Sequence, residues 1–107
     1  MTSTDKLFDL AVEYVKNSYA EKQYGDSNRT LTDNDKLEFY KYFKQATIGK
    51  NNTEKPGMFS FVAKAKWNAW NDLGDMSQED AKKQYVAALN KLAPEWKDYP
   101  EIKKQLE

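Results

Sequence analysis

The sequence predicts an all-α fold, a bundle of four helices in one domain, and three observations lead to this prediction. Apolar residues recur at intervals of three and four positions in four segments of the chain. Polar stretches that contain Gly or Pro separate these segments, and a Ser or Thr with an acid three residues later precedes two of them. No segment alternates apolar and polar residues as a half-buried strand does. A length of 107 residues allows one core.

The first predicted helix covers residues 4–19, and a long loop follows it. Ser3 or Thr4 can cap its first turn, and Asp5 and Asp9 favour the positive end of the helix dipole. Its apolar residues have helical spacing: Leu7, Phe8, Ala11, Val12 and Val15. Residues 20–33 lose this pattern and contain the turn sequence Gly-Asp-Ser-Asn, which predicts a loop that is long for so small a domain.

The second predicted helix begins at Thr32 and ends near Gly49. Thr32 and Asp35 have the spacing of a capping box. The apolar residues of this helix are Leu37, Phe39, Tyr40, Phe43 and Ala46. A polar loop over residues 49–57 follows and closes with a Pro-Gly pair.

The third predicted helix follows this loop and stops at Gly74, because glycine suits the left-handed conformation at a helix end. The fourth begins with a second capping box, Ser77 with Asp80, and Pro94 ends it. We expect these two helices to supply core side chains: Phe61, Val62, Trp70, Val86, Leu89 and Leu92. The tail is predicted to add one short turn after Pro100, with Ile102 and Leu106 as its apolar side.

The composition excludes several classes of chemistry. The chain has no cysteine and no histidine, which excludes disulfides, thiolate metal sites, Cys nucleophiles, Ser-His-Asp catalysis and nearly every zinc site. The N-terminal segment lacks the apolar run of a signal peptide, and no apolar stretch approaches the roughly 20 residues of a membrane span. These features predict a soluble, cytoplasmic binding protein rather than an enzyme.

Charge is unevenly distributed along a chain whose formal net charge is zero. Residues 36–72 hold 7 basic and 3 acidic side chains, a net +4, whereas residues 1–35 carry −3 and residues 73–107 carry −1. A basic middle segment in a neutral protein indicates a local anionic ligand. A nucleic-acid partner is not expected, because such domains more often have a pI above about 9 and this pI is near 6.3. The alternative is that these lysines only solvate exposed helix faces.

One face of the second helix combines an aromatic ring with positive charge. Four residues share this face because they are spaced i, i+3, i+4 and i+7: Leu37, Tyr40, Lys41 and Lys44. A tyrosine one turn before a lysine suits a ligand that holds an aromatic ring and a phosphate about one helical turn apart. In the third helix Lys64 and Lys66 lie on nearly opposite sides, so one of them can face the ligand. Alternatively, Tyr40 belongs to the core or its rim and the lysines only contact solvent, which periodicity alone favours.

Two longer motifs carry a family resemblance. The first consists of Tyr40, Phe43, Lys44, Gln45, Ala46, Thr47 and Gly49. The second consists of Pro56, Gly57, Lys64, Lys66, Trp67 and Trp70. With Ser77, Ala81 and Tyr85 of the fourth helix, they make residues 5–93 closely resemble the acyl-CoA-binding protein family, also called diazepam-binding-inhibitor-like. The resemblance implies an up-down-down-up four-helix bundle in a domain of residues 1–93, which holds the CoA ester of a medium- to long-chain fatty acid. Residues 94–107 are then a C-terminal extension.

The resemblance also implies roles for single residues. Tyr40 corresponds to the tyrosine that stacks on the adenine ring, and Lys44 and Lys66 correspond to the lysines that hold the ribose 3′-phosphate. Lys16 corresponds to a basic residue near the CoA phosphates, and Tyr85 to a ligand-facing tyrosine on the last helix. Three apolar residues fall where the family lines its acyl groove: Phe8, Val12 and Leu37.

Three departures from the family pattern affect the expected groove. The loop over residues 20–33 is longer than in short members and forms either a disordered bulge, which we prefer, or a lid beside the groove. Val12 stands where a smaller alanine is frequent, which predicts a tighter groove. Lys36 stands where an apolar residue is usual, which predicts a shorter preferred acyl chain.

The sequence therefore predicts a monomeric carrier and pool buffer for fatty acyl-CoA that catalyses no reaction and requires no metal or cofactor. One alternative is a helical protein- or nucleic-acid-interaction module that uses the basic middle segment. Zero net charge and the presence of one arginine, Arg29, count against it. Another alternative is an enzyme that acts on acyl-CoA, but no histidine, cysteine or motif-placed acid is available as a base.

Overall fold

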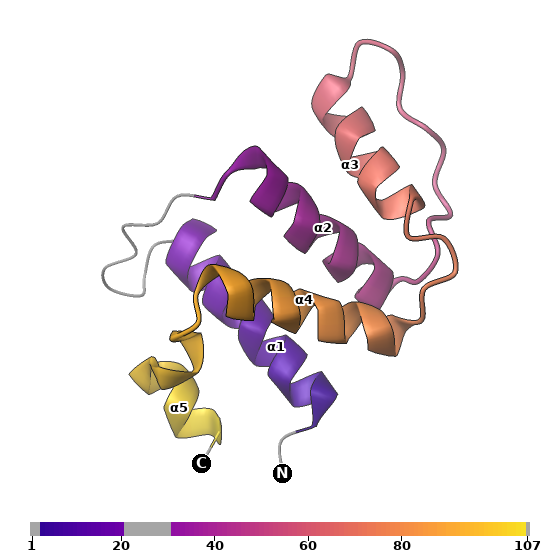
Figure 1. The fold of residues 1–107 in the computed structure, drawn as a ribbon. Helices are drawn as coiled ribbons and strands as arrows, with labels where there is room; N and C mark the ends of the chain where they lie inside the picture. Colours follow the sequence, from indigo (N-terminus) through magenta and orange to yellow (C-terminus); the bar gives the residue numbers. More distant parts are fainter. Residues whose placement is uncertain (1–2, 21–30, 107) are drawn as a thin grey trace.

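The computed structural model describes residues 3–20 and 31–106, and its regular elements are helices (Figure 1). In chain order they are α1 (Thr4–Val15), the π-helical turn η1 (Lys16–Ala20), α2 (Asp33–Thr47), α3 (Phe61–Asn71), α4 (Gln78–Leu92), the 3-10 turn η2 (Trp96–Asp98) and α5 (Pro100–Leu106). This order confirms the predicted all-α fold. The loop predicted over residues 20–33 falls mainly on residues 21–30, which lie outside the described residues, so the bulge and the lid both remain predictions.

Side-chain caps begin three of the helices as the sequence predicts. Ser3 caps α1, because its side chain accepts a backbone N–H of the first turn at 3.2 Å. Thr32 and Asp35 form the complete capping box of α2, each side chain accepting the other residue's backbone N–H at 3.1 Å. Ser77 caps α4 by accepting the backbone N–H of Asp80 at 3.0 Å, which is one of the two bonds of the predicted capping box. These bonds satisfy N–H groups that the helices cannot pair internally.

The predicted stops also match the structure. Gly49 has a φ of +99° directly after the C-cap of α2, and Gly74 has a φ of +56° shortly after α3. A side chain at either position would strain the backbone, whereas glycine adopts these angles freely. The chain thus turns away from each helix at a residue that the sequence marks.

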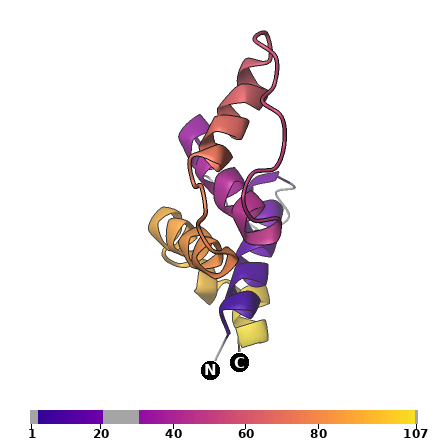
Figure 2. The same cartoon turned by 90° about the vertical axis from the view of Figure 1, so that its right-hand side faces the viewer.

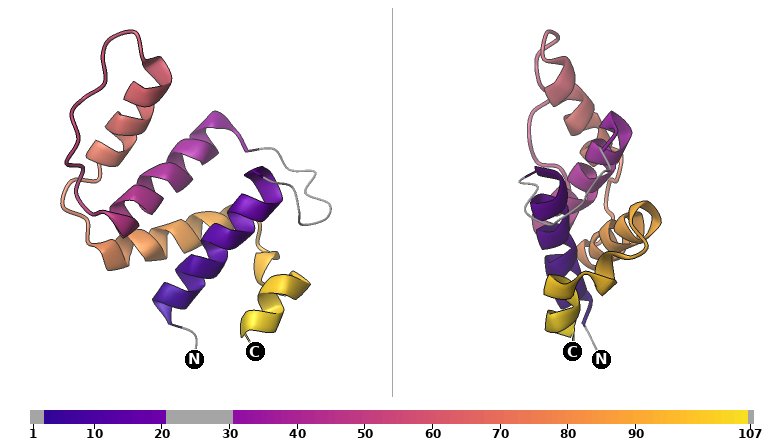
Figure 3. Two further views of the ribbon diagram at one scale, coloured as in Figure 1. Left: turned by 180° about the vertical axis from the view of Figure 1, so that it is seen from behind. Right: turned by 90° about the vertical axis from the view of Figure 1, so that its left-hand side faces the viewer.

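Helix α4 is the element against which both α1 and α2 pack, and α3 packs against α2. Figures 1 and 2 show the consequence for the overall shape: α3 and the loop before it form one end of the molecule, and both termini lie at the opposite end. The views in Figure 3 agree with this arrangement. The molecule is accordingly elongated and flat, with extents of 45, 30 and 18 Å.

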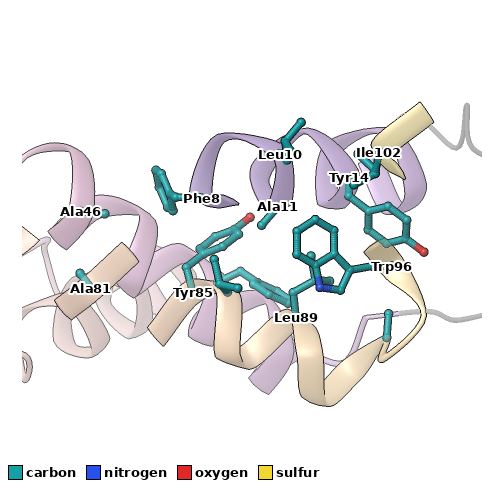
Figure 4. Packing of buried hydrophobic residues seen from close by; sticks show 13 residues of the cluster. Phe8, Leu10, Ala11, Tyr14, Ala46, Ala81, Tyr85, Leu89, Trp96 and Ile102 are labelled. Carbon is teal, nitrogen blue, oxygen red and sulfur yellow. The ribbon is translucent and has the colours of Figure 1, made fainter. Parts of the chain in front are cut away.

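Three aromatic rings connect the central helices. Tyr85 of α4 contacts Phe8 of α1 edge to face, with ring centroids 5.2 Å apart, and Phe39 of α2 at 5.1 Å. All three side chains are buried. Edge-to-face and tilted ring pairs stabilise a core beyond the area that they bury. This ring cluster, shown in part in Figure 4, lies where the three helices meet.

The C-terminal tail packs into the same core. Trp96 and Ile102 are both fully buried, and the Trp96 ring lies 6.1 Å from that of Tyr14 on α1. The Trp96 Nε1–H donates to Oδ1 of Asn90 on α4 at 2.7 Å. Figure 4 shows Tyr14, Trp96 and Ile102 gathered at one end of the core. The predicted short turn after Pro100 is present as α5. Together with η2 it packs against α1 and α4 in the buried cluster.

Two expected core residues lie outside the core. Phe61 and Val62 are 75% and 72% exposed. The reason is that α3 packs on α2 through its C-terminal end, where Trp70 is buried, whereas the first turn of α3 extends beyond α2 (Figure 1). Leu92 is half-buried against the core, and Val86 and Leu89 are buried as expected. The first helix reaches its predicted end, but its last turn is π-helical rather than α-helical.

Replacing Trp96 by alanine is expected to lower the free energy of unfolding by about 3–5 kcal/mol, since a large buried ring and its hydrogen bond are lost. Urea denaturation followed by circular dichroism measures this change. Lys103→Ala on the exposed side of α5 is the control and should change the value by no more than about 0.5 kcal/mol. Equal stability of Trp96→Ala and the parent chain would contradict a structural role for the tail.

Candidate functional site

Tyr40, Lys44 and Lys66 lie together on the surface where α2 meets α3. The Lys66 Nζ is 5.4 Å and the Lys44 Nζ 5.9 Å from the centroid of the Tyr40 ring. Tyr40 and Lys44 are half-buried, and Lys66 is exposed. Two ammonium groups therefore flank one aromatic ring, at distances where the ring attracts a cation. We call these three residues the ring–lysine cluster.

Helix geometry explains how the ring–lysine cluster forms. Tyr40 and Lys44 are four residues apart on α2 and so share one face, as the spacing predicts. Of the two lysines on opposite sides of α3, Lys66 is the one that reaches Tyr40. Within the described part of the chain, neither Lys44 nor Lys66 takes part in an ion pair. Their charges are thus available to an anion.

Trp70 fixes α3 to the end of α2. Its side chain is 3% exposed, and its Nε1–H donates to the Gly49 carbonyl at 2.8 Å. The Lys44 Nζ lies 5.7 Å from the centroid of the Trp70 ring. Because Lys66 precedes Trp70 by one helical turn, this anchor also sets the position of Lys66. The core position expected for Trp70 is confirmed.

Gln45 is a positioning residue that the sequence reasoning missed. It is fully buried, and its Nε2 donates to the carbonyls of Gly74 at 3.1 Å and Met76 at 2.7 Å. The Gln78 Nε2 donates in the opposite sense, to the Ala46 carbonyl on α2 at 3.1 Å. These bonds hold the connection between α3 and α4 on α2. The sequence feature that could have indicated this role is the position of Gln45 within the first motif.

A hollow of about 570 Å³ opens between α2 and α3. Its lining combines apolar and charged side chains: Asn34, Leu37, Glu38, Lys41, Ala69, Asp72 and Leu73. Leu37 and Lys41 belong to the same face of α2 as Tyr40 and Lys44, so the hollow continues the surface of the ring–lysine cluster. Three of the seven lining residues are apolar and two are acids, so the hollow offers a ligand both apolar and polar contacts beside the positive cluster.

The remaining predicted site residues lie elsewhere. Phe8 and Tyr85 are buried in the ring cluster, 4% and 3% exposed, rather than beside Tyr40. Val12 is half-buried and packs against the same core. Lys16 is exposed on η1, at the end of α1. The structure therefore brings together three of the eight predicted residues, places Leu37 next to them, and leaves Phe8 and Tyr85 in the core.

Burial affects the acidity of Tyr85. Removal of its hydroxyl from water raises the pKa of Tyr85 well above the ordinary value of 10.0, because the tyrosinate would be formed in an apolar environment. Tyr85 is thus a neutral core residue across the physiological pH range.

The chemistry of the site is that of binding. The Tyr40 ring offers a stacking surface for a planar heterocycle, and two ammonium groups offer charge-assisted contacts to a phosphate.

Among residues 3–20 and 31–106, none of the helices has both the length and the apolar composition to cross a bilayer.

Comparison with known sequences identifies relatives. The profile of the family described as "Acyl CoA binding protein" matches residues 5–89. Acyl-CoA-binding protein homolog 3 of Caenorhabditis elegans is 41% identical over 91 residues, which cover 84% of this chain and 73% of that protein. Acyl-CoA-binding domain-containing protein 5 of Xenopus tropicalis is 40% identical over 85 residues, which cover 79% of this chain and 18% of that protein. Similar sequence thus occurs in a protein of comparable length and within a much longer one.

Comparison with solved structures gives the same result. The crystal structure of ACBP from Moniliophthora perniciosa is 38% identical with a TM-score of 0.76, covering 99% of this chain and 92% of that chain. The solution structure of the acyl CoA binding protein from Babesia bovis is 47% identical with a TM-score of 0.71, covering 90% of this chain and 99% of that chain. These matches confirm the bundle that the family resemblance implies.

Substituting Tyr85 by phenylalanine is expected to flatten the loss of stability at high pH. The pKa of Tyr85 is raised in the folded state, so above pH 10 the unfolded chain releases a proton that the folded chain retains. The contribution of Tyr85 to the free energy of unfolding is therefore fully present below pH 10. It falls at higher pH, by at most about 1.4 kcal/mol per pH unit. Urea denaturation of both proteins between neutral and strongly alkaline pH measures the difference. Identical slopes would contradict the shifted pKa.

Proposed function

Because the chain belongs to the acyl-CoA-binding protein family, we propose that it binds medium- to long-chain fatty acyl-CoA esters without covalent bonding. It then serves as a cytoplasmic, monomeric carrier and pool buffer in lipid metabolism, and not as an enzyme. The observation that carries this proposal is the ring–lysine cluster, in which two ammonium groups flank one tyrosine ring.

The ring–lysine cluster binds the nucleotide part of the ligand. The adenine ring stacks on Tyr40, and Lys44 and Lys66 hold the ribose 3′-phosphate. Lys16 contributes positive charge near the remaining CoA phosphates. Stacking of a base on an aromatic side chain contributes about 1–3 kcal/mol, and a hydrogen bond to a charged group about 1.5–3 kcal/mol. The support for these roles is that three side chains from two helices meet at one point of the surface.

The acyl chain lies in a groove that begins at the hollow beside Leu37. Val12 and Leu37, both half-buried, contact the chain, and Phe8 and Tyr85 form the floor of the groove from the core side. Burial of a palmitoyl chain of roughly 14 methylenes contributes at most about 11 kcal/mol, at about 0.8 kcal/mol each. The ordering of the chain and of the complex reduces this value.

Affinity is expected to rise from free CoA to octanoyl-CoA to palmitoyl-CoA, by up to roughly fourfold for each methylene that becomes buried. Isothermal titration calorimetry with the three ligands in one buffer measures the series. Absence of binding by all three ligands would refute the proposed function. Binding that ignores chain length and weakens steeply with salt would instead favour an interaction module for polyanions.

Lys66→Ala and Lys44→Ala are each expected to weaken palmitoyl-CoA binding by about 10- to 150-fold, since each removes a charge-assisted phosphate contact. Tyr40→Ala should weaken it by about 5- to 150-fold through loss of stacking. Lys64→Ala is the matched control, because Lys64 lies two residues from Lys66 on the other side of α3 and carries the same charge. Equal effects of Lys64→Ala and Lys66→Ala would show that net charge alone matters and would contradict the site.

A further inference from the structure

Four large apolar side chains are exposed at the end of the molecule that α3 forms. Met58 is 68%, Phe59 87%, Phe61 75% and Val62 72% exposed. They are nearly consecutive in sequence, at the end of the α2–α3 loop and in the first turn of α3, and we call residues 58–62 the α3 tip. Single exposed apolar residues are common on monomers, but a contiguous group indicates a surface that binds something.

The α3 tip is held in place by its surroundings rather than left loose. The Ser60 N–H donates to the Gly57 carbonyl at 3.1 Å, which forms a turn directly before α3. Earlier in the loop, the Thr53 carbonyl accepts the Trp67 Nε1–H at 3.0 Å, and Asn51 Nδ2 donates to the Trp67 carbonyl at 3.3 Å. These bonds fasten the loop to α3. The tip therefore projects as a formed structure, away from α1, α4 and both termini (Figures 1 and 2).

Positive charge surrounds the α3 tip. Lys55 precedes it, with its Nζ 5.9 Å from the Trp67 ring centroid, and Lys64 and Lys66 follow it on α3. Residues 53–66 hold these three lysines and one acid, Glu54, a net +2. Apolar side chains at a protruding point with lysines behind them have the pattern of a segment that enters the headgroup region of an anionic bilayer.

We infer that the α3 tip is a docking site for an anionic lipid surface, with Met58, Phe59, Phe61 and Val62 inserted at the level of the headgroups. Charge complementarity favours this occupant over a second copy of the chain. Contact between two tips would bring their lysines together and oppose association, whereas anionic lipids neutralise them. The tip protrudes at one end of the molecule (Figures 1 and 2), which suits insertion into a soft surface.

Docking through the α3 tip would place the ring–lysine cluster beside the membrane. Val62 and Lys66 are four residues apart on α3, a rise of about 6 Å along the helix axis. Lys66 in turn reaches the Tyr40 ring. An acyl-CoA whose chain lies in the bilayer exposes its phosphates at this same level. This consequence rests on the proposed function, while contact with the lipid surface itself does not depend on it.

Vesicle co-sedimentation tests the inference with the ligand-free full chain. The parent chain is expected to bind vesicles of phosphatidylcholine mixed with phosphatidylserine and to bind pure phosphatidylcholine vesicles much more weakly. Met58→Ser/Phe59→Ser should reduce binding to the mixed vesicles at least tenfold. Both positions precede α3, so the helix itself is kept. Ile48→Ser is the matched control, because it removes another exposed apolar residue, 48% exposed, outside the tip, and should leave binding unchanged.

Three results would overturn the inference. These are no binding of the parent chain, equal binding of the parent and the tip variant, or an equal loss in Ile48→Ser. Sedimentation without lipid adds a fourth: a dimer of the parent chain that the tip variant abolishes would assign the tip to a second copy. Calorimetry with palmitoyl-CoA in solution separates this inference from the proposed function. The tip variant should retain the parent chain's affinity for palmitoyl-CoA. Failure of the parent chain to bind acyl-CoA would refute the proposed function. Vesicle binding would still decide the role of the tip.

Discussion

The contact of Tyr85 with Phe8 and Phe39 is the interaction on which the other features depend, because one side chain of α4 joins α1 and α2 through it. It also determines which way α2 faces. Phe39 points into the core, and Tyr40, the next residue, is rotated by about 100° around the helix axis and lies at the surface. The core contact thus orients the face that carries Tyr40 and Lys44. A neutral, buried Tyr85 suits this role.

A site built from two helices requires that their relative position be fixed, and several motif residues serve this purpose. Trp70 bonds to the Gly49 carbonyl, and Gln45 bonds to two carbonyls beyond α3. None of these three bonds involves a side chain of the ring–lysine cluster. Part of the motif therefore serves the fold rather than the ligand, since a buried polar group left without its hydrogen-bond partner costs about 1–3 kcal/mol.

Most of the fold could be predicted from local signals, and the failures have physical causes. The caps at Thr32 and Ser77 and the stops at Gly49 and Gly74 are local, so the sequence determines them directly. Phe61 and Val62 have the periodicity of core residues, but periodicity does not say how far a helix extends beyond its neighbour. The places of Trp96 and Gln45 depend on partners far along the chain, which spacing within one segment does not reveal. The meeting of Tyr40 with Lys44 was predictable from one helix, whereas the choice of Lys66 required the family motif.

The attachment of α3 to the rest of the molecule has a consequence for how stability is distributed. α1, α2, α4 and the tail share the buried cluster, while α3 leans on α2 mainly through Trp70. A helix with so little buried surface of its own opens more readily than the core. A molecule bound between α2 and α3 would act as the missing packing partner of α3, and its binding energy would raise the stability of that helix most. Ligand binding would then slow hydrogen exchange of the backbone amides of α3, and the exchange rates of the core amides would change least.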